Sequence, residues 1–360
     1  MKKKLNKKNI NVAIIGTGFG AETHLPAFHE CENASIYTIY GRNKKKVNHL
    51  SKIYNVQKQF KSYKDLLNDK NIDLVSISLA PSLQYKYTNE ALDARKHVIC
   101  EKPFTCNKND AYLLYKKAKK NKLTNAVGYQ LRFQPARKII KNFLLGNDLG
   151  KVISVNMSYD FSSRIQNKPN YNWWSSTKDG GGVLNAMGSH QLDLLKWWFG
   201  DPIEVYANTN VYNKELRDKN NKNKKTTAEE IAQILIKFKK NVICTLNISS
   251  IAIGWKASMI NIYAEKGSLF LEGEEDLKFV RKTTAKHNLT EKDLLLKKSW
   301  ISGSIWRAAF YRQVDSLIDS LISNKEYEGA NFYDGYKIQE VIDSIRKSSK
   351  IKRSQRINYK

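Results

Sequence analysis

The segment that most constrains the fold of this chain is Val12–Ala21, where a short apolar strand runs directly into the pattern G-x-G-x-x-A. Glycines at such a turn let the backbone approach a pyrophosphate, and the following helix aims its first amide groups at the phosphate charge. The pattern alone is a weak signal, and a tight turn without a ligand is the alternative, but its place between a strand and a helix favours a dinucleotide site. The residues that we expect to contact the dinucleotide here are Gly16, Thr17, Gly18, Phe19, Gly20 and Ala21.

A lysine follows a second apolar strand, because His97–Cys100 leads directly into Glu101, Lys102 and Pro103. In an open parallel sheet, ligands bind outside the carboxyl ends of the strands, where both this lysine and the glycine loop would lie. A nucleotide cradle that faces a lysine suggests a nicotinamide-dependent enzyme.

The residue after the second strand of such a fold selects the cofactor. NAD-binding proteins usually place a carboxylate there to accept a hydrogen bond from the ribose 2′-hydroxyl. This chain has Tyr40, Gly41, Arg42, Asn43 and Lys44 instead, and the planar guanidinium of the arginine suits a 2′-phosphate. We therefore expect NADP(H) to be preferred over NAD(H), with a solvated arginine at the start of a basic helix as the alternative.

The first third of the chain alternates apolar strands with helical segments, which is typical of a parallel sheet covered on both faces. This pattern predicts a doubly wound Rossmann domain over residues 1–129. The strands that we expect are Val12–Ile15, Ser35–Tyr40, Leu74–Leu79, His97–Cys100 and Asn125–Tyr129, and the helices are Glu22–Glu30, Lys44–Tyr54, Tyr85–Ala94 and Asp110–Asn121.

After Lys151 the chain changes to longer strands with period-two alternation, which predicts an antiparallel sheet with one exposed face. We expect residues 130–360 to form a second, α+β domain around a large, mostly antiparallel open sheet, and Asn213–Thr227 to be a solvated loop. The expected strands are Val152–Phe161, Ile203–Val211, Ile231–Phe238, Val242–Ser250, Ser258–Glu265 and Ser268–Leu271, and the expected helices are Pro135–Leu145, Ser189–Phe199, Ile305–Ser323 and Tyr333–Lys347.

The net charge of +28 raises the possibility of a nucleic-acid or membrane partner. The lysines are spread along the chain without interleaved aromatic residues, so a generally basic surface is the favoured interpretation and no nucleic-acid or membrane partner is expected. No apolar run approaches the ~20 residues of a membrane helix. The four cysteines show neither paired C-x-x-C spacing nor disulfide density, which favours reduced thiols in the cytoplasm, and no metal site is expected.

A third segment, Asp179–Asp193, contains three consecutive glycines followed by His190 at the start of a predicted helix. Asp193 lies three residues further on and therefore on the same helix face. A histidine held there can act as a general acid or base near neutral pH, although a structural cap is the commoner role for such a residue.

These three motifs, in this order and at these separations, make the whole chain resemble the glucose–fructose oxidoreductase / inositol dehydrogenase / MocA (Gfo/Idh/MocA) family. Supporting matches are His24, Ala80-Pro81, Gly128–Phe133 and Trp173-Trp174. The resemblance implies hydride transfer between a nicotinamide and a carbinol carbon of a sugar, sugar derivative or cyclitol. It also implies a homo-oligomer, a dimer or tetramer, that associates through the open sheet.

The resemblance also implies roles for individual residues. Lys102 is the main catalytic candidate and is also expected to contact cofactor and substrate, and His190 is expected to exchange a proton with the same carbinol. Asp193 is a third catalytic candidate, which either takes part in the chemistry or orients and supports the site. Glu101, Ala80 and Pro81 are expected on the cofactor side. Residues that we expect to contact the substrate, besides Lys102 and His190, are Tyr129, Arg132 and Trp174.

The chain departs from the family at Ala186, four residues before His190, where the family often has aspartate. An Asp–His pair cannot form as it does in those members, and the neighbouring Asn185 is not expected to replace it. Two alternatives to a simple dehydrogenase therefore stay open. One is a lyase or glycosidase that retains its cofactor, and the other is a non-catalytic sensor that binds NADP(H).

Overall fold

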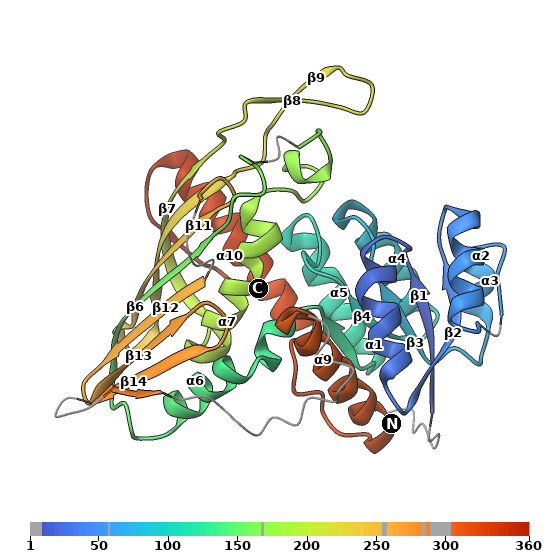
Figure 1. The fold of residues 1–360 in the computed structure, drawn as a ribbon, viewed down its shortest axis with the longest axis horizontal. Coiled ribbons are helices and arrows are strands. Elements are labelled where there is room, and N and C mark those ends of the chain that lie inside the picture. Colours follow the sequence, from blue (N-terminus) through green and yellow to red (C-terminus); the bar gives the residue numbers. More distant parts are fainter. Residues whose placement is uncertain are drawn as a thin grey trace. The chain divides into compact units, whose positions relative to one another are not determined.

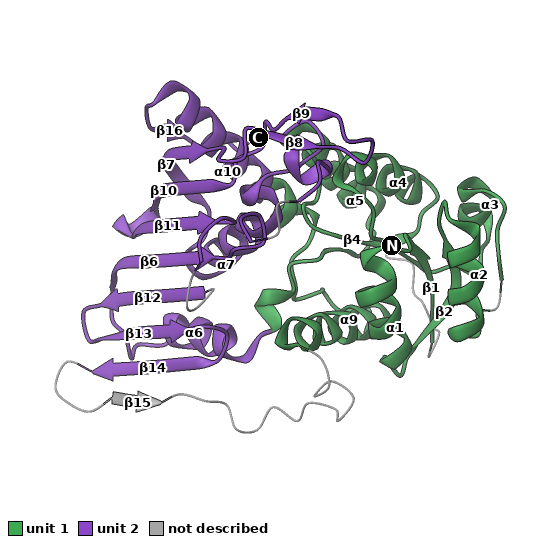
Figure 2. Cartoon of the chain, turned by 45° about the horizontal axis from the view of Figure 1, so that its top comes forward, with its two compact units in different colours: residues 1–133, 296–336 green, residues 134–295, 337–360 purple. Residues whose placement is uncertain are grey.

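The computed structural model describes residues 9–56, 58–166, 169–253, 258–281, 286–288 and 304–359. The chain divides into two compact units, shown in different colours in Figure 2. The first comprises residues 1–133 and 296–336, and the second comprises residues 134–295 and 337–360. Along the described ranges, no helix is both long enough and apolar enough to cross a membrane.

The first unit is built on a five-stranded parallel sheet with the order β2-β1-β3-β4-β5 (Figure 1), which confirms the predicted doubly wound sheet. Every residue of β3 and β4 is buried, as expected for strands covered on both faces. The strands are β1 (Ile10–Ile15), β2 (Ala34–Tyr40), β3 (Leu74–Ile77), β4 (His97–Cys100) and β5 (Asn125–Val127), and the helices are η1 (Gly20–His24), α1 (Leu25–Glu30), α2 (Lys44–Ile53), α3 (Tyr63–Asn68), α4 (Pro81–Asp93), α5 (Lys108–Asn121) and η2 (Gln130–Phe133).

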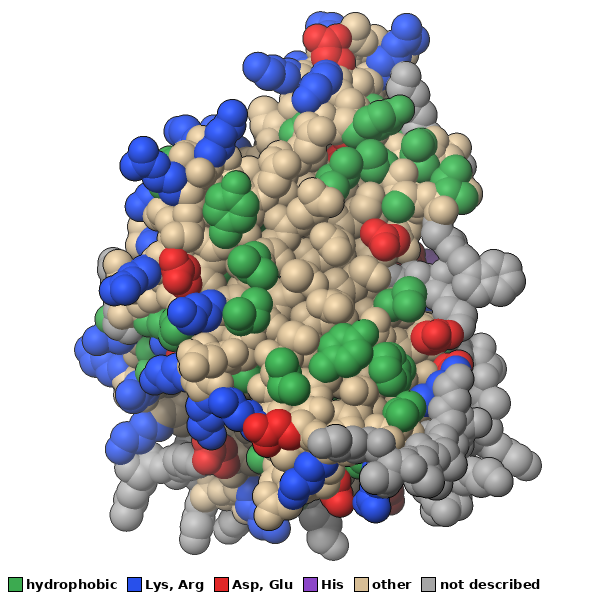
Figure 3. All heavy atoms as spheres, turned by 90° about the vertical axis from the view of Figure 1, so that its left-hand side faces the viewer, with side chains coloured by type: hydrophobic (Ala, Val, Ile, Leu, Met, Phe, Trp, Pro, Cys, Tyr) green, Lys and Arg blue, Asp and Glu red, His purple; other side chains and the backbone are tan. Residues whose placement is uncertain are grey.

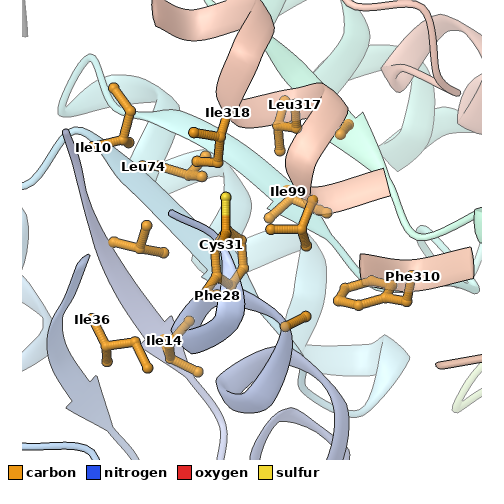
Figure 4. Packing of buried hydrophobic residues seen from close by; sticks show 14 of the residues in the cluster. Ile10, Ile14, Phe28, Cys31, Ile36, Leu74, Ile99, Phe310, Leu317 and Ile318 are labelled. Carbon is orange, nitrogen blue, oxygen red and sulfur yellow. The ribbon is translucent and has the colours of Figure 1, made fainter. Parts of the chain in front are cut away.

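A helix from late in the chain completes the core of this unit. Phe310, Leu317 and Ile318 on α9 (Ile305–Ser323) join a buried apolar cluster with residues of β1 and α1, such as Ile14 and Phe28 (Figure 4). The helix itself is the one predicted from the sequence, but periodicity does not say which sheet a helix covers. The domain boundary expected at residues 129/130 stays a prediction. The first compact unit continues to residue 133 and also includes residues 296–336.

The second unit contains a nine-stranded sheet with the order β15-β14-β13-β12-β6-β11-β10-β7-β16. Its strands pair antiparallel except β6 with β11, which confirms the prediction of a large, mostly antiparallel sheet. The strands are β6 (Val152–Asp160), β7 (Pro202–Asn210), β10 (Ile231–Phe238), β11 (Ile243–Ser249), β12 (Ser258–Ala264), β13 (Gly267–Glu272), β14 (Asp276–Arg281), β15 (Lys286–Asn288) and β16 (Gln355–Arg356).

Helices cover one face of this sheet. The ring of Phe143 on α6 (Pro135–Leu145) packs 4.9 Å from that of Phe279 on β14. Phe199 on α7 (Ser189–Phe199) packs 5.7 Å from Phe238 on β10. On α10 (Phe332–Ile351), the hydroxyl of Ser348 accepts a hydrogen bond from the backbone of β7. The opposite face carries the exposed residues of each alternating strand, which is the one-sided sheet that the sequence pattern predicts.

The segment Asn213–Thr227 is mostly exposed to solvent, as expected, but the expectation of a loop without strands is wrong. This segment contains a short antiparallel hairpin of β8 (Glu215–Arg217) and β9 (Asn223–Lys225). Asp218 closes its turn, because one carboxylate oxygen accepts backbone hydrogen bonds from Asn220 and Lys222. Three-residue strands made mostly of charged residues have no hydrophobic alternation by which they could be predicted.

Candidate active site

The glycine loop of the first unit leaves space beside its backbone. Gly16 has a φ of +117°, and a Cβ atom there would lie 2.1 Å from the carbonyl oxygen of Ser78, so this position requires glycine. In contrast, a Cβ atom on Gly18 would meet nothing within 4 Å. Open space at the second glycine, directly before the helical turn η1, fits the approach of a pyrophosphate to the backbone. The loop thus combines one position that requires glycine, Gly16, with open space at Gly18, and its contact with a dinucleotide stays a prediction.

The other predicted cofactor residues follow β2 and β3, the two strands that flank β1. Arg42 is exposed just beyond the end of β2, and Asn43 caps α2 by accepting a hydrogen bond from the Lys46 amide. At the end of β3, Ala80 precedes Pro81, the first residue of α4. Since β2, β1 and β3 are parallel neighbours, these residues follow the carboxyl ends of adjacent strands, as predicted.

The carboxylate of Glu101 anchors the turn that carries Lys102. One oxygen lies 3.0 Å from Nε2 of His24, and the other accepts a hydrogen bond of 3.1 Å from the backbone amide of Lys102. His24 is fully buried, and its Nδ1 lies 2.6 Å from the hydroxyl of Ser76. A Cβ atom at Gly128 would lie 2.6 Å from Glu101, so the glycine after β5 makes room for the carboxylate.

Lys102 lies at the end of β4, at the same edge of the sheet as the glycine loop. Burial lowers the pKa of its ammonium group, and the negative charge of Glu101 partly opposes that shift. A lysine with a lowered pKa can exchange a proton closer to neutral pH than an exposed one.

Two predicted substrate residues of the first unit are buried. Tyr129 is 1% exposed, and Arg132 lies on η2, where its guanidinium nitrogen is 3.4 Å from a carboxylate oxygen of Asp334. The charge of Arg132 is therefore balanced inside the first unit.

The remaining predicted residues belong to the second unit. Trp173 and Trp174 are half-buried on a short 3-10 turn, η3 (Trp173–Ser175), with their rings 5.8 Å apart. The glycine run leads into a π-helical turn, η4 (Leu184–Gly188), which continues without interruption into α7. His190 and Asp193 lie in the first part of α7 and are almost completely buried, as is Ala186 on η4.

Sequence reasoning did not single out Glu229 and Glu230, two buried carboxylates beside these segments. The sequence feature that could have drawn attention to them is a pair of adjacent acidic residues directly before a strand, in a chain with a large excess of basic residues. Within the described ranges, no group of three or more His, Cys, Asp or Glu side chains is placed to hold a metal ion.

Solved structures share this fold. Levoglucosan dehydrogenase in complex with NADH and levoglucosan has a TM-score of 0.90 at 16% identity, covering 98% of this chain and 100% of that one. The WlbA dehydrogenase from Bordetella pertussis, in complex with NADH and UDP-GlcNAcA, has a TM-score of 0.82 at 18% identity, covering 98% and 99%.

The curated relatives and the matching family models are oxidoreductases. An uncharacterized oxidoreductase of Synechocystis sp. is 33% identical over 272 residues, covering 75% of this chain and 73% of the relative. Glucose-6-phosphate 3-dehydrogenase of Bacillus subtilis is 24% identical over 250 residues, covering 67% and 68%. The family model for the NAD-binding Rossmann fold matches residues 10–129, and the model for the C-terminal alpha/beta domain matches residues 141–357. This chain therefore belongs to the Gfo/Idh/MocA family of oxidoreductases.

Proposed function

We propose that this protein is an NADP(H)-preferring oxidoreductase that transfers a hydride between the nicotinamide and a carbinol carbon of a sugar, sugar derivative or cyclitol. The observation that carries the proposal is the open space at Gly18 at the same sheet edge as Lys102, whose turn is anchored by Glu101. The sugar dehydrogenases among the relatives and neighbours support the substrate class.

Each site residue has a specific task in this proposal. The nicotinamide, when bound, supplies the hydride chemistry. The ammonium of Lys102 donates a hydrogen bond to the reacting oxygen and stabilises negative charge that develops there, and in the neutral form it takes up the hydroxyl proton. His190 exchanges a proton with the same oxygen and Asp193 supports the site. Trp174 provides an apolar wall for the sugar ring.

The cofactor preference is proposed from the exposed Arg42 and the absence of a carboxylate between Tyr40 and Lys44. A guanidinium can bond a 2′-phosphate through two parallel N–H groups, and its positive charge offsets part of the phosphate charge. Glu101, Ala80 and Pro81 are proposed to complete the cofactor site, since they follow strands of the same sheet.

One observation favours a second candidate function. Ala186 puts a methyl group at a buried position where many family members have aspartate. Loss of that carboxylate suits an enzyme that retains its dinucleotide and uses transient oxidation to drive elimination or glycoside cleavage. Cofactor that remains bound through purification, with no net change in nicotinamide absorbance during turnover, would favour this candidate.

The open sheet face is proposed as the contact of a homodimer or homotetramer. Although the chain carries a net charge of +28, the middle of this face is largely uncharged (Figure 3). Charged groups are depleted from the centres of protein interfaces. Near the middle of the central strands β12, β6, β11 and β10, the outward-facing side chains include Met259, Asn261, Ser154, Asn156, Ser158, Thr245, Asn247, Gln233 and Leu235. Two charged residues on the same face, Asp160 and Lys237, lie at or near the ends of β6 and β10.

Sedimentation measurements on Leu235→Lys test this interface. A two-fold axis would bring both introduced charges into one contact, so the variant is expected to be smaller than the wild type. An unchanged oligomer would contradict the proposed face.

The free thiol state of all four cysteines supports a reducing, cytoplasmic location for the protein.

The decisive experiment for the proposed reaction is a screen of sugars, sugar phosphates and cyclitols with NADP⁺, followed by the absorbance of reduced nicotinamide. The active substrate is then tested with Lys102→Met, which keeps a similar side-chain volume but removes the charge. We expect kcat/KM to fall about 10²- to 10⁴-fold, with a much smaller change in NADPH binding. Unchanged turnover in this variant would leave a cofactor-binding sensor or another catalytic group as the better explanation.

A further inference from the structure

Two consecutive buried glutamates stand directly before β10, and they contact different segments of the second unit. We infer that Glu229 and Glu230 are positioning residues with separate tasks: Glu229 fixes the segment that carries His190, and Glu230 fixes the turn that carries Trp174. This inference rests on the proposed function for the roles of His190 and Trp174.

Glu229 ties a helix of the C-terminal region to the triple-glycine segment. Its Oε1 accepts hydrogen bonds from Arg346 Nη2 at 2.9 Å and from the backbone amide of Leu184 at 3.3 Å, and its Oε2 accepts one from Arg346 Nε. The same guanidinium also donates to the carbonyl of Gly181 at 2.9 Å. One ion pair therefore fixes both sides of the turn that enters η4.

The glycines at this turn are required by close packing. Gly182 has a φ of +96°, and a Cβ atom there would lie 2.2 Å from the carboxylate of Glu229. A Cβ atom on Gly181 would lie 2.3 Å from the carbonyl oxygen of Trp173. The run is thus enclosed by a carboxylate on one side and by the tryptophan turn on the other.

The hydrogen bond from the Leu184 amide to Glu229 affects the position of His190 through the helix that joins the two residues. Leu184 is the first residue of η4, and η4 continues directly into α7, whose second residue is the histidine. The hydroxyl of Ser189 donates a hydrogen bond to the carbonyl of Asn185 across the junction. Because helical hydrogen bonds couple successive turns, a change in the position of Leu184 changes the position of the imidazole.

Glu230 makes a second network around the tryptophan turn. Its Oε1 accepts a hydrogen bond of 2.7 Å from Arg164 Nε, and Arg164 Nη2 donates to the hydroxyl of Ser175, the residue after Trp174. Its Oε2 accepts from the backbone amides of Tyr212 and Asn213. This carboxylate therefore joins η3 to the segment that leads into the β8–β9 hairpin.

The two carboxylates are buried to a similar extent, but they form hydrogen bonds with different segments of the second unit. Glu229 is 5% exposed and Glu230 is 2% exposed. Replacement by glutamine keeps the shape of each side chain but removes the charge, and it leaves an arginine without its full set of acceptors. Any difference between the two variants therefore reports which segment each glutamate positions.

Steady-state kinetics on Glu229→Gln and Glu230→Gln test the division of tasks. For Glu229→Gln we expect kcat to fall about 10- to 100-fold, because the proton-exchanging group is misplaced, with KM for the sugar changed less. For Glu230→Gln we expect the reverse, a raised KM for the sugar with the smaller change in kcat. The same parameter affected to a similar extent in both variants would overturn the inference.

A conservative variant covers the case in which Glu229→Gln does not fold. Arg346→Lys keeps the positive charge but cannot bond Glu229 through two groups while also reaching Gly181. It is expected to lower kcat in the same way as Glu229→Gln, by a smaller factor. An unchanged kcat in a folded Arg346→Lys protein would contradict the assigned role of the ion pair.

Nuclear magnetic resonance tests the inference even if no sugar is turned over. The chain has six histidines and seven tryptophans, so the His190 ring and Trp174 indole signals can be assigned with His190→Gln and Trp174→Phe. We expect Glu229→Gln to move the His190 signal more than the Trp174 signal, and Glu230→Gln to do the opposite. The reverse pattern or equal shifts would refute the inference, while absent turnover with the expected shifts would count against the proposed function alone.

Discussion

The two glycine-rich turns of this protein look alike in sequence but differ in what lies beside them. In the first unit, a side chain added at Gly18 would enter open space. In the second unit, the same addition at Gly182 would collide with the carboxylate of Glu229. The first turn has open space at Gly18, where we propose that the dinucleotide binds, and the second is filled by the protein itself. A glycine run thus indicates close approach, and the structure shows where another part of the chain already fills the space beside it.

The largest change in stability should come from the filled turn. Gly182→Ala forces a side chain into the left-handed region and against a buried carboxylate, so we expect a loss of about 2–4 kcal/mol in unfolding free energy. Cofactor affinity should stay unchanged. Thermal melting with and without NADPH measures both quantities.

A matched control for this variant is Gly146→Ala in the same unit. A Cβ atom there meets its nearest neighbour at 3.5 Å, and Gly146 has a negative φ of −81°. We expect its melting temperature to remain within a few degrees of the wild type. Equal losses in the two variants would show that packing around Gly182 is not special.

Features of the fold that depend on residues close together in the sequence could be predicted, whereas features that depend on residues far apart in the sequence could not. The parallel sheet follows from local patterns, since buried strands such as Val12–Ile15 are continuous apolar runs. The position of α9 is not predictable in this way, because its packing against α1 and β1 joins residues nearly 300 positions apart in the chain.

The same distinction applies to the site. The glycine loop and Lys102 could be found because each lies in a short, recognisable motif at a strand end. Glu229 could not, because its partner Arg346 is 117 residues away and only the folded chain brings the two together. The β8–β9 hairpin was missed since its short charged strands lack alternation.

A smaller effect is expected for Arg42, which follows β2. Arg42→Ala should raise KM for NADP⁺ about tenfold, because it removes a charged bidentate partner of the 2′-phosphate. KM for NAD⁺, which lacks that phosphate, should change little. Initial rates with both cofactors give the comparison, and a parallel rise for the two would mean that Arg42 does not contact the 2′-phosphate.

The pH dependence of kcat/KM should reveal the lowered pKa of Lys102. Its pKa lies below the ordinary lysine value of 10.5 because of burial, so the neutral amine forms at a lower pH than in an exposed lysine. Oxidation of a carbinol needs a proton acceptor, and kcat/KM in that direction should therefore rise with pH through this lowered pKa. Lys102→Arg stays protonated and should lose the rising limb. A rising limb that persists in the variant would assign the titration to another group.

The most direct test of the account is a titration of wild type and Gly18→Ala with NADPH, followed by thermal melting. Ligand binding to the folded state raises the midpoint by mass action. We predict a clear rise for the wild type, and for Gly18→Ala a normal midpoint without ligand and little rise with it, because the added methyl occupies the space meant for the pyrophosphate. An equal NADPH-induced rise in both proteins would contradict the claim that this turn holds the dinucleotide.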